Sequence, residues 1–133
     1  MVKVIILTLA LFLMSTKPVY THYEMGSEIE TKFSELKSEV IPSQIEILSV
    51  QWNGRELIVD VSEEITSYGG GNATEYEVVS QLLAMAFSIP EVESFTLLIE
   101  GEEDHLPEGT QISGYTRERY MEKIRNDYHI NNE

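Results

Sequence analysis

The chain has 133 residues, a length that suits one domain and not two. Its 23 acidic residues outnumber nine Lys and Arg, and the net charge of −14 argues against partners that carry phosphate, such as nucleic acids and anionic lipid surfaces. The sequence has no cysteine, which excludes disulfides, thiolate metal sites, a thiol nucleophile and an acylated lipoprotein cysteine.

Residues 1–23 are predicted to be a signal peptide or an N-terminal membrane anchor. Lys3 supplies a positive charge, and an uncharged apolar run follows over residues 4–14. This run is shorter than the roughly 20 residues that cross a bilayer. The sites for cleavage are poor, so secretion and anchoring both remain open. Either way, the segment predicts export from the cytoplasm, and contact with a membrane only through this segment.

Residues 24–114 are predicted to form the folded domain, and they concentrate the charge. They hold 19 acidic residues and three basic ones, a net charge of −16. Copies of such a domain repel each other, most strongly at low salt. The isolated domain is therefore expected to be monomeric or only weakly self-associated.

The first helix is predicted over residues 27–40. Ser27 and Glu30 have the spacing of a capping box, and Pro42 ends the segment. Its apolar residues recur at helical spacing on one face: Ile29, Phe33, Leu36 and Val40.

A hairpin is predicted over residues 45–61. Alternation places two sets of apolar side chains on one side of the two strands: Leu48, Val50 and Trp52, then Leu57, Val59 and Val61. Asn53 and Gly54 between them are typical of a type I′ turn, which needs two residues with positive φ.

Residues 62–71 connect the hairpin to the next helix. Ser62 has the character of a cap for a short helical turn. Gly69, Gly70 and Gly71 follow, without the spacing or the basic residue of a phosphate-binding loop, so they are expected to reverse the chain tightly.

The second helix is predicted over residues 73–89. Asn72 with Glu75, or Thr74 with Glu77, would form its capping box. Its wide apolar face suits packing against a sheet, and it comprises Val78, Val79, Leu82, Leu83, Met85, Ala86 and Ile89.

The remaining elements are a strand over residues 94–100, an acidic loop, and a C-terminal helix over residues 115–128 within a tail of residues 115–133. Phe95, Leu97 and Ile99 alternate toward one side of the strand. The predicted fold is therefore α+β: about three mainly antiparallel strands with two helices packed on one face, plus a C-terminal helix.

Four residues are candidates for a partner surface. Ile58 and Leu98 point away from the predicted core, and Tyr120 and Tyr128 share one face of the C-terminal helix. The alternative is that this helix folds back and covers such apolar surface.

No catalytic residue, cofactor site or metal site is predicted. The histidines are far apart, no GxSxG motif occurs, and Asp60 is a lone carboxylate on a strand. The run from Glu100 to Asp104 lacks the order of an EF-hand loop, although weak Ca²⁺ binding is possible there. The sequence is consistent with two functions. The first is a non-catalytic assembly or interaction module, and the alternative is an extracytoplasmic module that binds an ion or a small ligand.

The ordered set of signals over residues 40–112 resembles the GerMN domain of sporulation and spore germination proteins. The resemblance rests on a V-D-V-S stretch at the end of the hairpin, three glycines, a Gln within the helix, a Pro step and a strand that ends near a Gly. The matching positions are Asp60, Ser62, Gly69, Gly70, Gly71, Gln81, Pro90 and Gly101.

The resemblance implies a small α+β fold similar to ring-building motifs. Proteins of this family are typically exported or membrane-anchored, and they are not known as enzymes. It also implies partners among other proteins of the spore envelope or of membrane complexes, and a role in assembly during sporulation or germination.

Overall fold

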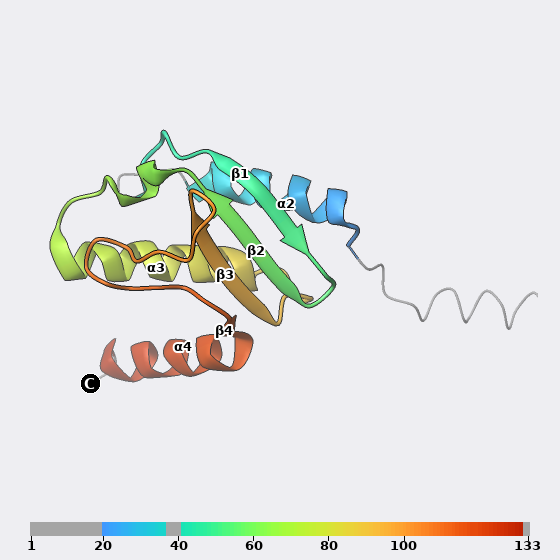
Figure 1. Ribbon diagram of the computed structural model, residues 1–133. Helices are drawn as coiled ribbons and strands as arrows, with labels where there is room; N and C mark the ends of the chain where they lie inside the picture. Colours follow the sequence, from blue (N-terminus) through green and yellow to red (C-terminus); the bar gives the residue numbers. More distant parts are fainter. Residues whose placement is uncertain (1–19, 37–40, 132–133) are drawn as a thin grey trace, which may run out of the picture.

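The computed structural model describes residues 20–36 and 41–131 (Figure 1). The elements are α2 (His22–Leu36), β1 (Ile47–Trp52), β2 (Glu56–Val61), the 3₁₀ turn η1 (Glu63–Thr66), α3 (Gly71–Phe87), β3 (Ser94–Ile99), β4 (Tyr115–Thr116) and α4 (Arg117–Asn131). The predicted α+β class with a C-terminal helix is confirmed. Val40, placed at the end of the first helix from the sequence, lies outside the described residues.

The four strands form one mixed sheet in the order β1-β2-β3-β4. β1 with β2 and β3 with β4 are antiparallel, whereas β2 and β3 are parallel, with Leu57 opposite Phe95. The parallel pair follows from the connection, because α3 carries the chain back across the sheet before β3 begins. The short β4 takes Tyr115 and Thr116, which the sequence had suggested were helical.

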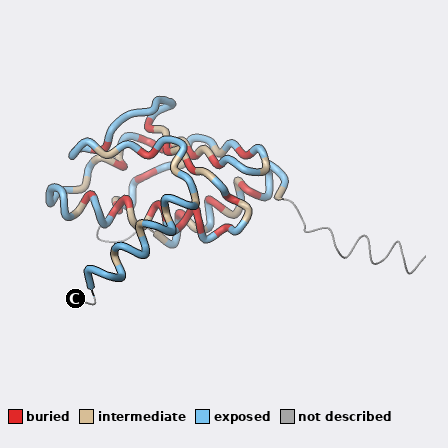
Figure 2. Tube along the Cα trace, turned by 90° about the horizontal axis from the view of Figure 1, so that it is seen from below, coloured by how far each residue is buried: buried red, intermediate tan, exposed pale blue. Residues whose placement is uncertain are grey.

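One face of the sheet carries the core. Its inward side chains on β2 and β3 are all buried: Leu57, Val59, Val61, Phe95, Leu97 and Ile99. α2 and α3 lie on this face (Figure 1), and the apolar residues predicted for α3 are all buried between the layers. In Figure 2 the buried positions gather in these layers, while α4 has no buried residue. The helices therefore cover one face and leave the other without a helix.

α2 begins earlier than predicted. The capping box is formed by Thr21, whose hydroxyl accepts a hydrogen bond from the Glu24 N–H at 3.0 Å, and by the Glu24 carboxylate, which accepts one from the Thr21 N–H at 3.2 Å. Ser27 and Glu30 have the same spacing but lie inside the helix, so that prediction was wrong. The buried residues of α2 are Met25, Ile29 and Phe33.

Ordered structure also reaches into the segment predicted to be a signal peptide or anchor. The Trp52 indole N–H donates to the Tyr20 carbonyl at 3.0 Å, which ties residue 20 to the end of β1. The apolar run of residues 4–14 lies outside the described residues. Among the helices of residues 20–36 and 41–131, none is long and apolar enough to cross a membrane.

The hairpin differs from its prediction in two details. An irregularity between Ile47 and Ser49 shifts the register of β1, so Ile47 pairs with Val61 and Leu48 is 46% exposed. The alternation that placed Leu48 in the core was therefore wrong. At the turn only Gly54 has positive φ, at 94°, which is the pattern of a type II′ turn around Gly54 and Arg55, not of type I′.

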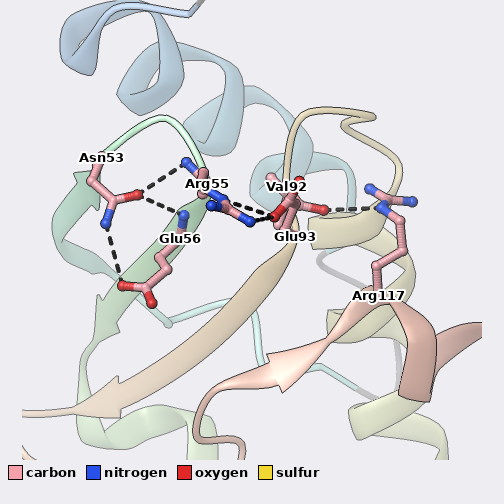
Figure 3. A network of polar contacts seen from close by, with 6 residues as sticks. All are labelled: Asn53, Arg55, Glu56, Val92, Glu93 and Arg117. Carbon is pink, nitrogen blue, oxygen red and sulfur yellow. Dashed lines mark hydrogen bonds and ion pairs between the residues drawn. The ribbon is translucent and has the colours of Figure 1, made fainter.

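Side chains stabilise this end of the hairpin (Figure 3). The Asn53 side-chain oxygen accepts hydrogen bonds from the backbone N–H groups of Arg55 and Glu56 at 3.0 and 2.8 Å. Arg55 also forms an ion pair of 2.6 Å with Glu93, just before β3. Both side chains are largely exposed, so this pair adds little stability but marks where the hairpin meets β3.

The start of α3 also corrects the sequence prediction. The helix begins at Gly71 and its N-cap is Gly70, with φ at 97° and no side-chain cap. Asn72 and Thr74 lie within the first helical turn, so neither predicted capping box forms. A Cβ on Gly70 would overlap the Thr74 side chain, and the positive φ disfavours other residues, so both features favour glycine at this position.

Candidate interaction surfaces

The sheet face without helices, here called the open face, presents the outward residues of β1, β2 and β3. The register aligns Gln51, Ile58 and Thr96 in one row across the strands, and Ser49, Asp60 and Leu98 in the next. Ile58 and Leu98 are half-buried and stand outside the core cluster. The structure therefore brings these two predicted surface residues onto one face, one row apart on neighbouring strands.

Asp60 lies at one end of the open face and holds the turn after β3. Its carboxylate accepts a hydrogen bond of 2.8 Å from the Gly101 N–H. Glu100 and Gly101 have φ values of 50° and 83°, the pattern of a type I′ turn, and Ile99 and Glu102 exchange backbone hydrogen bonds across it. Two family positions distant in sequence, Asp60 and Gly101, therefore make one structural contact.

Ser62 is buried and fixes the entry into β1. Its hydroxyl accepts a hydrogen bond of 2.9 Å from the Glu46 N–H, and its own N–H donates to the Glu46 carbonyl at 2.9 Å. It precedes η1 as predicted, but no side-chain cap forms there. The serine thus joins the two ends of the hairpin.

The remaining family positions lie apart from one another. Gly69 and Gly70 form the turn into α3, where Gly71 is the first residue. Gln81 donates to the Glu77 carboxylate at 3.1 Å on α3, and Pro90 is exposed after that helix. The family positions do not converge on one site.

A buried carboxylate on α3, missed at the sequence level, joins three segments. Glu75 is 2% exposed and accepts hydrogen bonds from the Tyr68 hydroxyl at 2.7 Å, the Glu108 N–H at 2.8 Å, and the Thr110 hydroxyl and N–H at 2.7 and 3.2 Å. Burial alone would raise the pKa of Glu75, but these hydrogen bonds outweigh it and lower the pKa. Burial and the bond to Glu75 raise the pKa of Tyr68. Glu75 therefore holds the acidic loop against α3.

α4 is attached through its first residue. The Arg117 guanidinium donates to the carbonyls of Phe87, Ile89 and Val92 at 3.2, 2.7 and 3.0 Å (Figure 3 shows the last). A cation at the carboxyl end of a helix also interacts favourably with the helix dipole. Arg117 thereby closes the end of α3 and sets the starting point of α4.

The tyrosines of α4 have different environments. Tyr120 is half-buried and stacks on Phe87 with ring centroids 5.0 Å apart, whereas Tyr128 is 65% exposed. Further along, the Lys123 ammonium donates to the Ser80 hydroxyl at 2.9 Å and to Asp127 at 2.9 Å. The helix folds back over the core at Tyr120, while Tyr128 remains accessible.

Several carboxylates of the acidic loop accept hydrogen bonds from nearby protein groups. Glu100 accepts a hydrogen bond from the Glu63 N–H at 3.0 Å, and Glu103 accepts one from the Ser113 hydroxyl at 2.9 Å. Within residues 20–36 and 41–131, no three His, Cys, Asp or Glu side chains come together as metal ligands would.

The comparison with family models decides the family. The model named Germane, described as sporulation and spore germination, matches residues 24–105, which is more than half of the chain. The chain belongs to the Germane family. No curated protein matches it.

Solved structures share the fold of this Germane domain. It is similar to a lipoprotein candidate from Clostridium perfringens, with 16% identity and a TM-score of 0.55 over 69% of this chain and 66% of that one. It is also similar to the first GerMN domain of the sporulation protein GerM from Bacillus subtilis, with 24% identity and a TM-score of 0.51 over 59% and 60% of the two chains.

The tandem GerMN domains of the same GerM protein give 22% identity and a TM-score of 0.54 over 77% of this chain and 39% of that one. The chain thus spans less than two thirds of the length of each of these solved chains. Because the sequence identities are all below 25%, these similarities establish a shared fold.

Proposed function

We propose that this Germane domain is a non-catalytic interaction module that acts outside the cytoplasm in sporulation or spore germination. Its partners would be other proteins of the spore envelope or of a membrane complex. The observation that carries the proposal is the open face, where Ile58 and Leu98 present apolar surface on a sheet without a helix above it.

The site chemistry agrees with binding and not with catalysis. The buried carboxylate of Glu75 accepts four hydrogen bonds from Tyr68, Glu108 and Thr110. The Asp60 carboxylate accepts one from the Gly101 N–H. These groups stabilise turns and loops, so neither is presented to a substrate.

The charge defines which partners are suitable. With a net charge of −16 over residues 24–114, the domain repels nucleic acids and anionic lipid surfaces, so contact with a membrane would occur only through the N-terminal segment. The same charge favours a monomer or weak self-association in isolation. Sedimentation at low and high salt tests this expectation, and a tight oligomer at low salt would contradict it.

Export is supported by the apolar run of residues 4–14 and by the lipoprotein candidate that shares the fold. Because the sequence has no cysteine, anchoring would not use an acylated cysteine. Residues 1–26 fused to a reporter that works only outside the cytoplasm should give activity, whereas reporter activity confined to the cytoplasm would refute export.

The interaction role is tested on the open face. Replacing Ile58 and Leu98 by Thr removes apolar surface while keeping residues that suit a strand. We expect the double variant to lose the partners cross-linked to the wild-type protein in sporulating cells, with thermal unfolding little changed. Ile130→Thr on α4, where the side chain is 72% exposed, is the matched control and should retain them. Retention of every partner by the double variant would refute the proposal for this face.

A further inference from the structure

β1 is an edge strand: within residues 20–36 and 41–131, no strand pairs with the side of β1 that faces away from β2. In the described sheet it pairs only with β2. The hairpin closes at Asn53 and Glu56, whose backbone groups bond at 3.4 Å. Antiparallel pairs alternate from there, so the N–H and C=O of Val50 and Trp52 point away from β2. The bulge between Ile47 and Ser49 limits the regular free edge to the second half of β1.

A shallow groove runs along this edge, between β1 and α2. It consists of two adjoining hollows of about 300 and 390 Å³, both of which are lined by Glu30 and Ile47. Gly26 and Ser27 of α2 line the first hollow, opposite residues 47–50 of β1. The groove and the regular free edge therefore meet at Val50, which belongs to both.

Gly26 is difficult to explain by the fold alone. It lies inside α2, where glycine destabilises a helix by about 1 kcal/mol relative to alanine. A Cβ at this position would meet nothing within 4 Å, so packing does not require glycine. A larger side chain there would occupy the groove. Keeping the groove open is a physical reason for glycine at position 26.

The groove is bordered by acidic side chains. Glu30 and Glu46 line it and are both exposed, and neither has an ion pair among the described residues. Lys32 on the same helix is paired with Glu28 at 3.6 Å. A cationic segment would therefore be favoured in this groove over a neutral or acidic one.

We propose that the groove between α2 and β1 binds an extended, basic segment of a partner protein, which adds to the sheet as a strand beside β1. Backbone hydrogen bonds to Val50 provide the pairing, and Lys or Arg side chains of the segment face Glu30 and Glu46. The inference rests on the proposed role as an interaction module, but it uses a different surface from the open face.

The probe is a nine-residue peptide of alternating Lys and Val, titrated onto the full chain by calorimetry. Two matched peptides accompany it, one with Glu in place of Lys and one with N-methyl groups on alternate backbone amides. We expect the Lys peptide to bind, and both matched peptides to bind at least about tenfold more weakly, because the first loses charge pairing and the second loses backbone hydrogen bonds.

The decisive variant is Gly26→Leu, which should bind the Lys peptide at least about tenfold more weakly while unfolding at the same or a higher temperature. Ala73→Leu on the exposed side of α3 is the matched control and should bind as the wild type does. The double variant of the open face, with Thr at positions 58 and 98, should also bind the Lys peptide as the wild type does. Loss of binding at the groove can therefore be distinguished from loss of partners at the open face.

Several results would overturn this inference. No binding of the Lys peptide at millimolar concentration refutes the groove as a site for a basic segment. Equal binding of the N-methylated peptide refutes strand addition, and equal binding by Gly26→Leu places the peptide elsewhere. If the wild-type protein dimerises and Gly26→Leu abolishes the dimer, the occupant is a second copy of the chain, and the proposal of a basic partner fails.

Discussion

Substitution of Glu75 offers the sharpest test of the internal structure. In Glu75→Gln, the amide oxygen can still accept the two hydrogen bonds from Thr110, while the amide N–H₂ replaces the oxygen that accepts from Tyr68 and Glu108. The Tyr68 hydroxyl can rotate and become an acceptor. The Glu108 N–H cannot, so one backbone donor loses its acceptor at a buried site.

The expected cost follows from these contacts. An unsatisfied buried donor costs about 1–3 kcal/mol, and the remaining hydrogen bonds lose the strength given by a charged acceptor. We therefore expect Glu75→Gln to reduce the free energy of unfolding by about 2–4 kcal/mol, measured by urea denaturation at pH 7. Tyr68→Phe removes only one of the four hydrogen bonds and should cost about 1–2 kcal/mol.

The pH dependence supplies an independent check. The pKa of Glu75 is lowered on folding from its ordinary value of 4.5, so its stabilisation is fully present above that value and is lost as the pH falls through the folded-state pKa. The difference in unfolding free energy between wild type and Glu75→Gln should therefore shrink in acid. A difference below about 0.5 kcal/mol at neutral pH, or one that grows in acid, would refute the reasoning.

Substitutions at three further positions, one of them with a neighbouring control, test other contacts. Gly70→Ala should lower the free energy of unfolding by about 1–3 kcal/mol, because residue 70 has positive φ and a Cβ there would overlap Thr74. Gly69→Ala is the control and should change the free energy of unfolding by less than about 1 kcal/mol. Thermal or urea unfolding measures both. Asp60→Ala should increase amide hydrogen exchange at Gly101 while costing only about 1 kcal/mol, and unchanged exchange would contradict the assigned contact. Arg117→Ala should cost about 2–4 kcal/mol and expose α4 to limited proteolysis first; equal protease resistance would show that α4 is held elsewhere.

Local periodicity predicts the elements that carry the core. The apolar spacing in α3 and the alternation in β2 and β3 identify buried faces correctly, since each pattern reports which side of its own element avoids water. The outward positions of Ile58 and Leu98 follow from the same alternation. These features depend on neighbours within one element, so a single sequence contains them.

Features that depend on distant partners were not predictable in the same way. Ser27 with Glu30 and Thr21 with Glu24 have the same capping spacing, and the structure begins α2 at the second pair, which includes the buried Met25 in the helix. From its spacing to Asn72, Glu75 is predicted to be a capping residue, whereas two of its three partners, Glu108 and Thr110, come from a loop more than 30 residues later. The groove beside β1 depends on where α2 lies in space, which no periodicity reveals.

The parallel pairing of β2 with β3 also determines the order in which the molecule can fold. The β1–β2 hairpin needs only a short turn, so it can form early. Pairing of β3 with β2 must instead close a much longer stretch of chain that contains η1 and α3. Arg117 then finds its three carbonyls only when the end of α3 is already in place. Docking of α4 through Arg117 therefore depends on the end of α3, and a chain that stops before residues 94–99 would leave the inner faces of β2 and α3 without β3 beside them.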